Sequence, residues 1–216
     1  MDKYHMKNLV LVVFSLMLAA CNSGDIPEVT INSASHMGAG CPAGTGDITL
    51  SSDRRTLSVL FDNYEAVAGL GSAPEGGSDL TTSRVACNML VSLHIPSGYQ
   101  AFLVGADFRG SVTLPIDATA QFTREYFFAG DNSPSLTEEW NHEVDNVEIK
   151  IFDDLYADAY SYSLCGEDVI LRSNTSLYVS APADGDTALI QLDSFDYLNQ
   201  PARTQFDYEF SYVRCS

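Results

Sequence analysis

The segment Phe206-Asp207-Tyr208-Glu209-Phe210-Ser211-Tyr212, close to the end of the chain, alternates aromatic and polar side chains without interruption. Successive side chains of a β-strand point to opposite faces of the sheet, so a period of two predicts a strand with one aromatic and one polar face. An aromatic face of this kind is buried only when the sheet packs against a second layer. The segment therefore predicts a half-buried strand of a layered all-β fold.

Most of the remaining chain carries the same signal in shorter segments. Turn residues such as Pro96-Ser97-Gly98 separate apolar or alternating runs, and helical periodicity is weak throughout. The expected strands are Thr56–Phe61, Met89–Ile95, Gln100–Phe108, Ser111–Leu114, Thr119–Phe128, Val144–Phe152, Leu177–Val179, Ala188–Phe195 and Phe206–Val213. Arg109-Gly110 is expected to separate two of them, and Gly69–Ser83 to be a loop. About ten short strands with long polar loops predict an antiparallel β-sandwich.

The amino terminus has the form of an export signal. Lys3 and Lys7 precede an apolar run from Leu9 to Ala20, whose 12 residues are too few to span a hydrocarbon core of roughly 30 Å. The run ends in Leu18-Ala19-Ala20-Cys21, which resembles the lipobox of bacterial lipoprotein signal peptides. The resemblance implies cleavage before Cys21 and a diacylglycerol on its sulfur. The alternative is an ordinary signal peptide cut after Ala20, which would leave a free thiol.

The lipobox also implies a location. Two or three acyl chains hold a protein stably on a bilayer, whereas one chain binds only marginally. Asn22 follows the cysteine, and by resemblance to the sorting pattern the absence of Asp there implies the outer membrane of a bacterial cell envelope. The expected organisation is a signal peptide at 1–20, a flexible polar tether at 21–38 and a β-sandwich domain at 39–216.

The charge balance excludes one class of partner. The chain of 216 residues has a net charge of −18, and without residues 1–20 it keeps 9 basic and 28 acidic residues, a balance of −19. Nucleic-acid binding needs clustered Lys and Arg, so no nucleic-acid partner is expected. The carboxylates are explained by solubility and colloidal repulsion, or alternatively by capture of cations or basic partners.

Besides Cys21 the chain has four cysteines, an even number in an oxidising compartment. They allow three pairings, and no CxxC or Cys/His spacing indicates zinc. We expect Cys41–Cys87 and Cys165–Cys215, because each bond would close a loop of about 45 to 50 residues within its own half of the chain. On the entropic model each loop is worth roughly 4 kcal/mol. The second bond would also fix the last strand.

Several segments resemble, in the same order, those of the DUF4360 family of secreted proteins of unknown function. The segments are Gly40-Cys41-Pro42-Ala43-Gly44-Thr45, Leu57-Ser58-Val59-Leu60-Phe61-Asp62-Asn63-Tyr64-Glu65-Ala66, Arg84-Val85-Ala86-Cys87-Asn88, His94-Ile95-Pro96-Ser97-Gly98-Tyr99, Ala106-Asp107-Phe108-Arg109-Gly110, Leu164-Cys165-Gly166 and Arg214-Cys215. The resemblance covers about residues 39–215 and implies a small secreted β-rich domain with the same four cysteines. It implies no activity. The chain departs from the family in its lipid anchor, its acidity and the segment Glu138-Glu139-Trp140-Asn141-His142-Glu143.

No catalytic constellation is assigned. His36 falls in the expected tether, His94 at a strand end beside Pro96 and His142 in an acidic loop, and no GxSxG elbow occurs. His94 is expected to be a structural histidine, hydrogen-bonded at a turn. Neighbouring carboxylates could serve glycosidase chemistry, but such pairs arise by chance among 28 acids. They are Asp153-Asp154, Glu138-Glu139 and Asp184-Gly185-Asp186.

Four residues are candidates for binding: Asp107, Arg109, His94 and Trp140. Arg109 is either exposed on a turn or paired with Asp107 to steady a strand bend, and we expect the second, with Gly110 at positive φ. Trp140 stands in a polar loop, where its ring would either meet a carbohydrate or fold over the edge of the domain.

Acidic loops could supply oxygen ligands to Ca²⁺, although none has the full EF-hand pattern. The candidates are Asp184 and Asp186, and secondly Asp131-Asn132, with a solvated turn as the favoured alternative. No other cofactor is expected.

Two functions therefore remain. The first is a non-catalytic envelope lipoprotein whose β-sandwich is structural or binds a ligand, such as a carbohydrate or an envelope protein. The second is a secreted hydrolase that acts on polysaccharide through carboxylates. A deep cleft with converging polar groups would favour the enzyme, and a filled core with shallow surfaces the binding domain.

Overall fold

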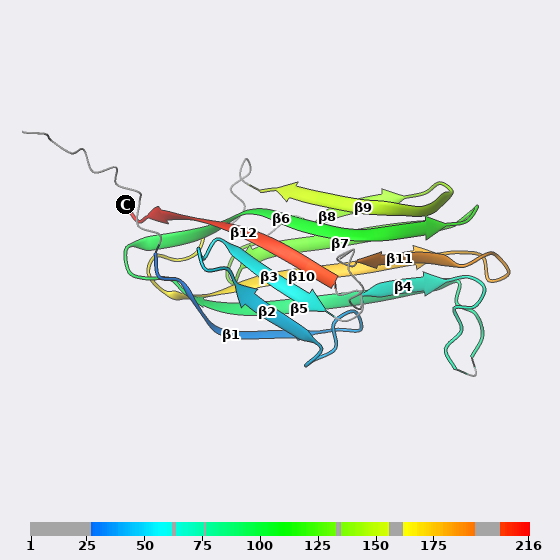
Figure 1. Ribbon diagram of the computed structural model, residues 1–216, viewed down its shortest axis with the longest axis horizontal. Coiled ribbons are helices and arrows are strands. Elements are labelled where there is room, and N and C mark those ends of the chain that lie inside the picture. Colours follow the sequence, from blue (N-terminus) through cyan, green and yellow to red (C-terminus); the bar gives the residue numbers. More distant parts are fainter. Residues whose placement is uncertain (1–26, 62–63, 76, 133–134, 156–161, 193–203) are drawn as a thin grey trace, which may run out of the picture.

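Two antiparallel sheets face each other (Figure 1). Buried hydrophobic side chains form the core between them. The computed structural model describes residues 27–61, 64–75, 77–132, 135–155, 162–192 and 204–216. These residues contain 12 strands, so the expected antiparallel β-sandwich is confirmed. Within the same residues, no helix has the length and apolarity needed to cross a membrane.

The five-stranded sheet has the order β1-β5-β10-β7-β8. Its strands are β1 (Thr30–Met37), β5 (Thr82–His94), β10 (Asp168–Ser180), β7 (Thr119–Phe128) and β8 (Leu136–Trp140). Buried and more exposed positions alternate strictly along β7 and, apart from buried Ser176, along β10, as the period of two requires. Edge strand β8 is the Glu138-Glu139-Trp140 segment expected as a loop.

The seven-stranded sheet has the order β2-β3-β12-β6-β11-β4, and β9 pairs with β6 as well. Its strands are β2 (Gly46–Leu50), β3 (Thr56–Phe61), β12 (Thr204–Arg214), β6 (Tyr99–Leu114), β11 (Ala188–Leu192), β4 (Glu65–Ala68) and β9 (Val144–Asp154). The same part of β6 pairs with both β12 and β9, so these two lie on its opposite edges.

Strand β6 is continuous, which corrects the expected break at Arg109-Gly110. What changes there is its neighbour: β12 pairs with Tyr99–Phe108, and β11 takes the same edge from Gly110 onward. Gly110 is not at positive φ, contrary to expectation. Instead, a Cβ at Gly110 would lie 2.1 Å from the carbonyl oxygen of Gln191, so the close approach of β11 requires the glycine.

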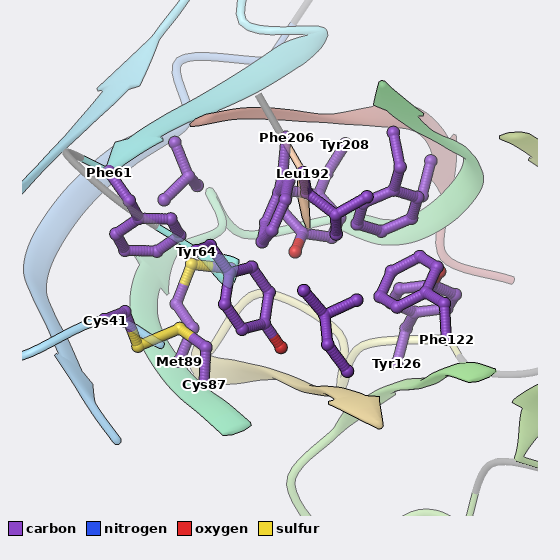
Figure 2. Close-up of a cluster of buried hydrophobic side chains, with 14 of the residues drawn as sticks. Cys41, Phe61, Tyr64, Cys87, Met89, Phe122, Tyr126, Leu192, Phe206 and Tyr208 are labelled. Atoms are coloured by element: carbon purple, nitrogen blue, oxygen red, sulfur yellow. A yellow bond between two sulfur atoms is a disulfide. The ribbon is translucent and has the colours of Figure 1, made fainter. Parts of the chain in front are cut away.

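Aromatic side chains from both sheets fill the core (Figure 2). The ring of Phe108 makes edge-to-face contacts with Phe206, its partner on β12, at 4.9 Å and with Phe122, across the interior on the other sheet, at 5.0 Å. Two phenols have buried partners: Tyr64 donates to the Thr175 hydroxyl at 2.9 Å, and Tyr208 bonds the Ser173 hydroxyl at 2.8 Å. The aromatic face of the Phe206–Tyr212 segment is thus buried as its alternation predicted.

Both expected disulfides are present. Cys41–Cys87 joins the β1–β2 connection to β5 beside the ring of Tyr64 (Figure 2). Cys165–Cys215 ties the end of β12 to the segment before β10.

The expected tether at 21–38 is too long at its carboxyl end, because Thr30–Met37 forms edge strand β1 along β5. His36 is therefore a buried residue of the sandwich and not part of a tether. It stacks edge-on against Phe61 at 5.2 Å, and its Nδ1 lies 3.1 Å from the Cys41 carbonyl oxygen. Alternation is weak in this polar segment, so pairing with β5 decides its structure.

Candidate functional site

The outer face of the seven-stranded sheet carries two of the four predicted binding residues, Asp107 and Arg109. Phe108 points into the core, so its neighbours Asp107 and Arg109 point outward, and Arg109 Nε donates to Asp107 Oδ1 at 3.3 Å. Asp107 lies opposite Asp207 of β12 on one side and Phe152 of β9 on the other. The predicted Asp–Arg pair exists, but on a continuous strand rather than at a bend.

Phe152 is the most unusual residue of this face. Its side chain is 58% exposed, although it lies on a regular strand. A Cβ at Gly105 would lie only 2.9 Å from Cζ of Phe152, so the ring covers the backbone of β6 where that strand has no side chain. The sheet thus supports the aromatic ring from below, and the rest of the ring is open to solvent.

A hollow of about 450 Å³ lies next to Gly105 on the same sheet. It forms where the β6–β12 register shifts between Glu209 and Phe210, which leaves Val104 without a direct partner on β12. The residues that line it are Asp53, Arg55, Thr56, Val104, Glu209, Phe210 and Ser211. The hollow is shallow and open, and its wall offers both carboxylates and a guanidinium.

The turn that leads into β3 is held by its own side chains. The Ser51 hydroxyl donates to Asp53 Oδ1 at 2.5 Å, and the backbone N–H of Arg55 donates to the same oxygen at 3.2 Å. These bonds favour the charged form and lower the pKa of Asp53 below its ordinary value. Tyr212 donates to the carbonyl of Arg54, and burial raises the pKa of Tyr212 to about 12. These hydrogen bonds therefore hold the Asp53 carboxylate in a fixed position in the wall of the hollow.

A second pair of rings is formed by Phe102, which lies on β6 three residues before Gly105, and by Tyr162, its partner in an isolated bridge. Phe102 is almost completely covered, and the ring of Tyr162 lies against it at 5.1 Å while remaining 44% exposed. At a rise of about 3.3 Å per residue, the two exposed rings, Tyr162 and Phe152, lie roughly 10 Å apart along β6. The hollow and its bulged residue Val104 belong to the same stretch of the strand.

We call this surface the aromatic platform: Phe152 on Gly105, the hollow, and Tyr162 on Phe102. Exposed rings stack on apolar faces of ligands, while carboxylates and guanidinium groups bond hydroxyls at their edges. A sugar ring offers both kinds of surface. The arrangement is therefore suited to reversible binding of a carbohydrate.

The other two binding candidates lie elsewhere. His94 is on the five-stranded sheet, where its Nδ1 lies 2.7 Å from Oδ1 of Asp168 on the neighbouring strand. This hydrogen bond lowers the pKa of Asp168 below its ordinary value. Trp140 ends edge strand β8 opposite Ala120 and packs, half-buried, against the core. The structure thus brings Asp107 and Arg109 together and leaves His94 and Trp140 apart from them.

The neighbouring carboxylates do not form pairs on one face. Asp153 points into the core, whereas Asp154 is exposed. Glu138 and Glu139 alternate along β8, and Glu139 accepts a bond from Gln121 at 3.0 Å. Asp184 and Asp186 are exposed in a turn whose Gly185 carbonyl already accepts the N–H of Leu70 at 2.9 Å. Across the described residues there is no group of three or more His, Cys, Asp or Glu placed to hold a metal ion, and calcium binding stays a prediction.

A buried ion pair between the sheets was not predicted. Arg124 of β7 donates from Nε and from an Nη to the two oxygens of Asp153 on β9, both at 2.6 Å, and Tyr126 donates to the same carboxylate. The side chains of Arg124 and Asp153 are only 6% and 7% exposed. Burial disfavours the guanidinium charge, but the hydrogen bonds and charge of Asp153 outweigh it, so the pKa of Arg124 is raised. The Asp153 carboxylate therefore has a structural role, as the partner of Arg124 and Tyr126.

The sequence contains signals for both features that were missed. Ile149, Ile151 and Asp153 share one face of β9, so alternation alone places Asp153 on the apolar side. Phe152 belongs to the opposite, polar face with Glu148 and Lys150, where a phenylalanine is not needed for the core. A charged residue on the apolar face and an aromatic residue on the polar face were both visible as breaks in the pattern.

Comparisons with known proteins agree on family but not on function. A family model described as "Domain of unknown function (DUF4360)" matches residues 27–215. An uncharacterized secreted protein of Arthroderma benhamiae is 27% identical over 176 residues, which cover 81% of this chain and 69% of that protein. The solved structure of TmCBM61 in complex with beta-1,4-galactotriose matches at 9% identity and a TM-score of 0.27, covering 85% of this chain and 90% of the other. At that TM-score the match supports no conclusion about this chain.

Proposed function

The chain belongs to the DUF4360 family, and from this premise we propose that it is a non-catalytic, lipid-anchored envelope protein that binds carbohydrate on the aromatic platform. The observation that carries the proposal is the position of Phe152. A large aromatic ring lies on the backbone of Gly105, open to solvent and beside a hollow lined by hydrogen-bonding side chains. Exposing such a ring has a cost in water, and stacking on a ligand offsets it.

The charge of the platform selects among carbohydrates. The hollow itself is lined by two carboxylates, Asp53 and Glu209, and by one guanidinium, that of Arg55, while Asp107 and Asp207 lie beside it. Like charges across an interface cost binding energy, so uronic acids and phosphorylated sugars are disfavoured. The proposed ligand is therefore a neutral glycan, whose hydroxyls donate to the carboxylates.

The anchor in this proposal is the lipid on Cys21, which the lipobox implies. It would hold the platform at a membrane of the bacterial envelope, the outer membrane by the residue that follows the cysteine. The relative from Arthroderma benhamiae is described as secreted, which agrees with export of this domain.

One observation favours a hydrolase as the second candidate. Asp107 and Asp207 lie directly opposite each other on neighbouring strands. Side chains in such positions have Cβ atoms about 4.5–5.5 Å apart, close to the roughly 5 Å between the carboxyl groups of retaining glycosidases. Against this role, Asp107 is bonded by Arg109, and the Ser58 hydroxyl donates to Asp207 at 2.6 Å.

Titration with neutral oligosaccharides tests the proposal. A panel of gluco-, galacto-, manno- and xylo-oligosaccharides is screened, and the best binder is titrated calorimetrically against wild type, Phe152→Ala and Phe127→Ala. Phe127 is a half-buried ring on the outer face of the other sheet and serves as the matched control. Phe152→Ala is expected to weaken binding about tenfold or more, the loss of roughly 1.4 kcal/mol of stacking, with Phe127→Ala unchanged.

Three results would contradict this function. They are no binding by any neutral oligosaccharide, equal affinity of wild type and Phe152→Ala, or preference for the corresponding uronates. Release of new reducing ends that is lost in both Asp107→Asn and Asp207→Asn would instead establish the hydrolase.

A further inference from the structure

We infer that the sandwich stands end-on against the lipid bilayer, with the end that carries Pro27 and Ser216, the first and last described residues, as its contact surface. This inference rests on the lipid anchor of the proposed function, not on carbohydrate binding. It concerns the end built from residues 27–29, 96–99, 164–167 and 213–216, which we call the anchor end. In Figure 1 this end lies at the left, beside the C-terminus.

Backbone hydrogen bonds hold the segments of the anchor end together. Cys215 donates to the carbonyl of Gly98 and Gly166 to that of Tyr99, both at 2.9 Å. The disulfide Cys165–Cys215 then fixes Leu164 and Arg214 in neighbouring chain segments. The anchor end is therefore a rigid surface and not a set of loose tails.

The length of the amino-terminal segment places this end near the membrane. Val29 is buried in the core, and β1 begins at the next residue. Val29 lies eight positions after Cys21, and a fully extended chain spans at most about 3.3–3.6 Å per residue. The anchor end is thus held within about 29 Å of the lipidated sulfur, whatever path the segment takes.

The opposite end of the sandwich, at the β6–β7 turn, cannot reach the bilayer in an end-on orientation. Strand β6 has 16 residues and runs from Tyr99, at the anchor end, to Leu114, next to the β6–β7 turn. At about 3.3 Å per residue the turn lies roughly 50 Å away. The short connection can bring the far end to the bilayer only if the sandwich lies flat.

The surface chemistry of the anchor end suits a bilayer. Leu164 is 63% exposed and Val213 is 39% exposed. The guanidinium of Arg214 lies over the ring of Tyr99, 5.2 Å from its centroid. Apolar side chains beside an aromatic–arginine pair are favoured where hydrocarbon meets headgroups.

Fluorescence quenching by brominated lipids tests the orientation. The lipidated protein is reconstituted into phosphatidylcholine vesicles with brominated acyl chains, with Trp140→Phe removing the native indole. One tryptophan is then introduced, as Leu164→Trp at the anchor end or as Ile116→Trp in the β6–β7 turn. Ile116 is 68% exposed and is the matched control. Melting curves of each variant establish that it is folded.

Quenching of Leu164→Trp with a blue-shifted emission, and no quenching of Ile116→Trp, is the expected result. Equal quenching of both would show a sandwich that lies flat and would overturn the inference. So would unquenched Leu164→Trp in protein that co-floats with vesicles, because the end would then face water or another protein. A Cys21→Ser protein that still matures and co-floats would refute the anchor, whereas failure of carbohydrate binding would appear only in the titration.

Discussion

Arg124 and Asp153 are charged residues on faces of β7 and β9 that are otherwise apolar. Their bidentate contact joins the two sheets near one edge, and the hydroxyl of Tyr126 completes the bonding of the carboxylate. Removing two charges from water is costly, so such a pair contributes little net stability compared with apolar residues. The pair instead raises the free energy of any other packing of the two sheets in which one of these charges is buried without its partner.

Arg124→Met should destabilise the protein by about 3–5 kcal/mol, because it leaves the Asp153 carboxylate buried without its cation. The double variant Arg124→Met/Asp153→Leu should be less destabilised than Arg124→Met, since no unpaired charge remains. Urea denaturation measures both. Lys150→Met, which removes the exposed Lys150–Glu148 pair, is the control and should change stability by less than about 1 kcal/mol. If the double variant is the least stable of the three, the ion pair is itself a net stabilising contact.

At the scale of the elements, strand β6 organises the seven-stranded sheet. It has β9 on one edge and β12 followed by β11 on the other, and the change occurs at Gly110. The bulge at Val104 in the same strand forms the hollow of the aromatic platform. The site therefore arises from irregularities of one strand, not from a separate loop.

Gly110→Ala should destabilise the sheet by about 1–3 kcal/mol, because the new methyl group would overlap the carbonyl of Gln191. Hydrogen exchange should become faster in β11 more than in β12. Gly44→Ala is the control: its Cβ would meet nothing within 4 Å, and only its positive φ disfavours alanine. Unchanged exchange in β11 would show that the strand can move aside without cost.

The sequence predicted elements where alternation was strong and failed where pairing decides. The Phe206–Tyr212 and Thr119–Phe128 segments alternate, and both are strands with the expected buried faces. Thr30–Met37 is polar and forms a strand only because its backbone pairs with the edge of β5. Arg109-Gly110 has turn composition, but the glycine is required there because β11, some 80 residues away in the sequence, packs closely against it. The platform was missed for the same reason, since Gly105, Phe152 and Glu209 meet only in the sheet.

At the scale of the whole molecule, two disulfides tie distant parts of the chain. Cys41–Cys87 spans 46 residues and Cys165–Cys215 spans 50, so both restrict the unfolded chain to a similar extent. The second also secures the end of β12 at the anchor end. The cysteine count left three pairings, and the expectation that each bond stays within its own half of the chain selected the pairing that the structure has.

Replacing Cys165 and Cys215 together by Ser should lower the free energy of unfolding by roughly 4 kcal/mol on the entropic model, a large share of the 5–15 kcal/mol of a typical domain. The Cys41→Ser/Cys87→Ser variant should lose a similar amount. Only the first should also accelerate hydrogen exchange at the end of β12. Thermal unfolding of both variants under non-reducing conditions measures the effect, and an unchanged melting temperature in either would contradict the entropic account.

Strand β12 is the last strand of the chain, yet it lies inside its sheet, paired with β3 on one side and β6 on the other. During synthesis, β3 and β6 therefore each keep an open edge until β12 has been made. Such edges are templates for intermolecular pairing, and non-local pairing of this kind is slow. Folding of this sheet is consequently completed late, and the interval before β12 inserts is when chaperones would protect the chain from aggregation.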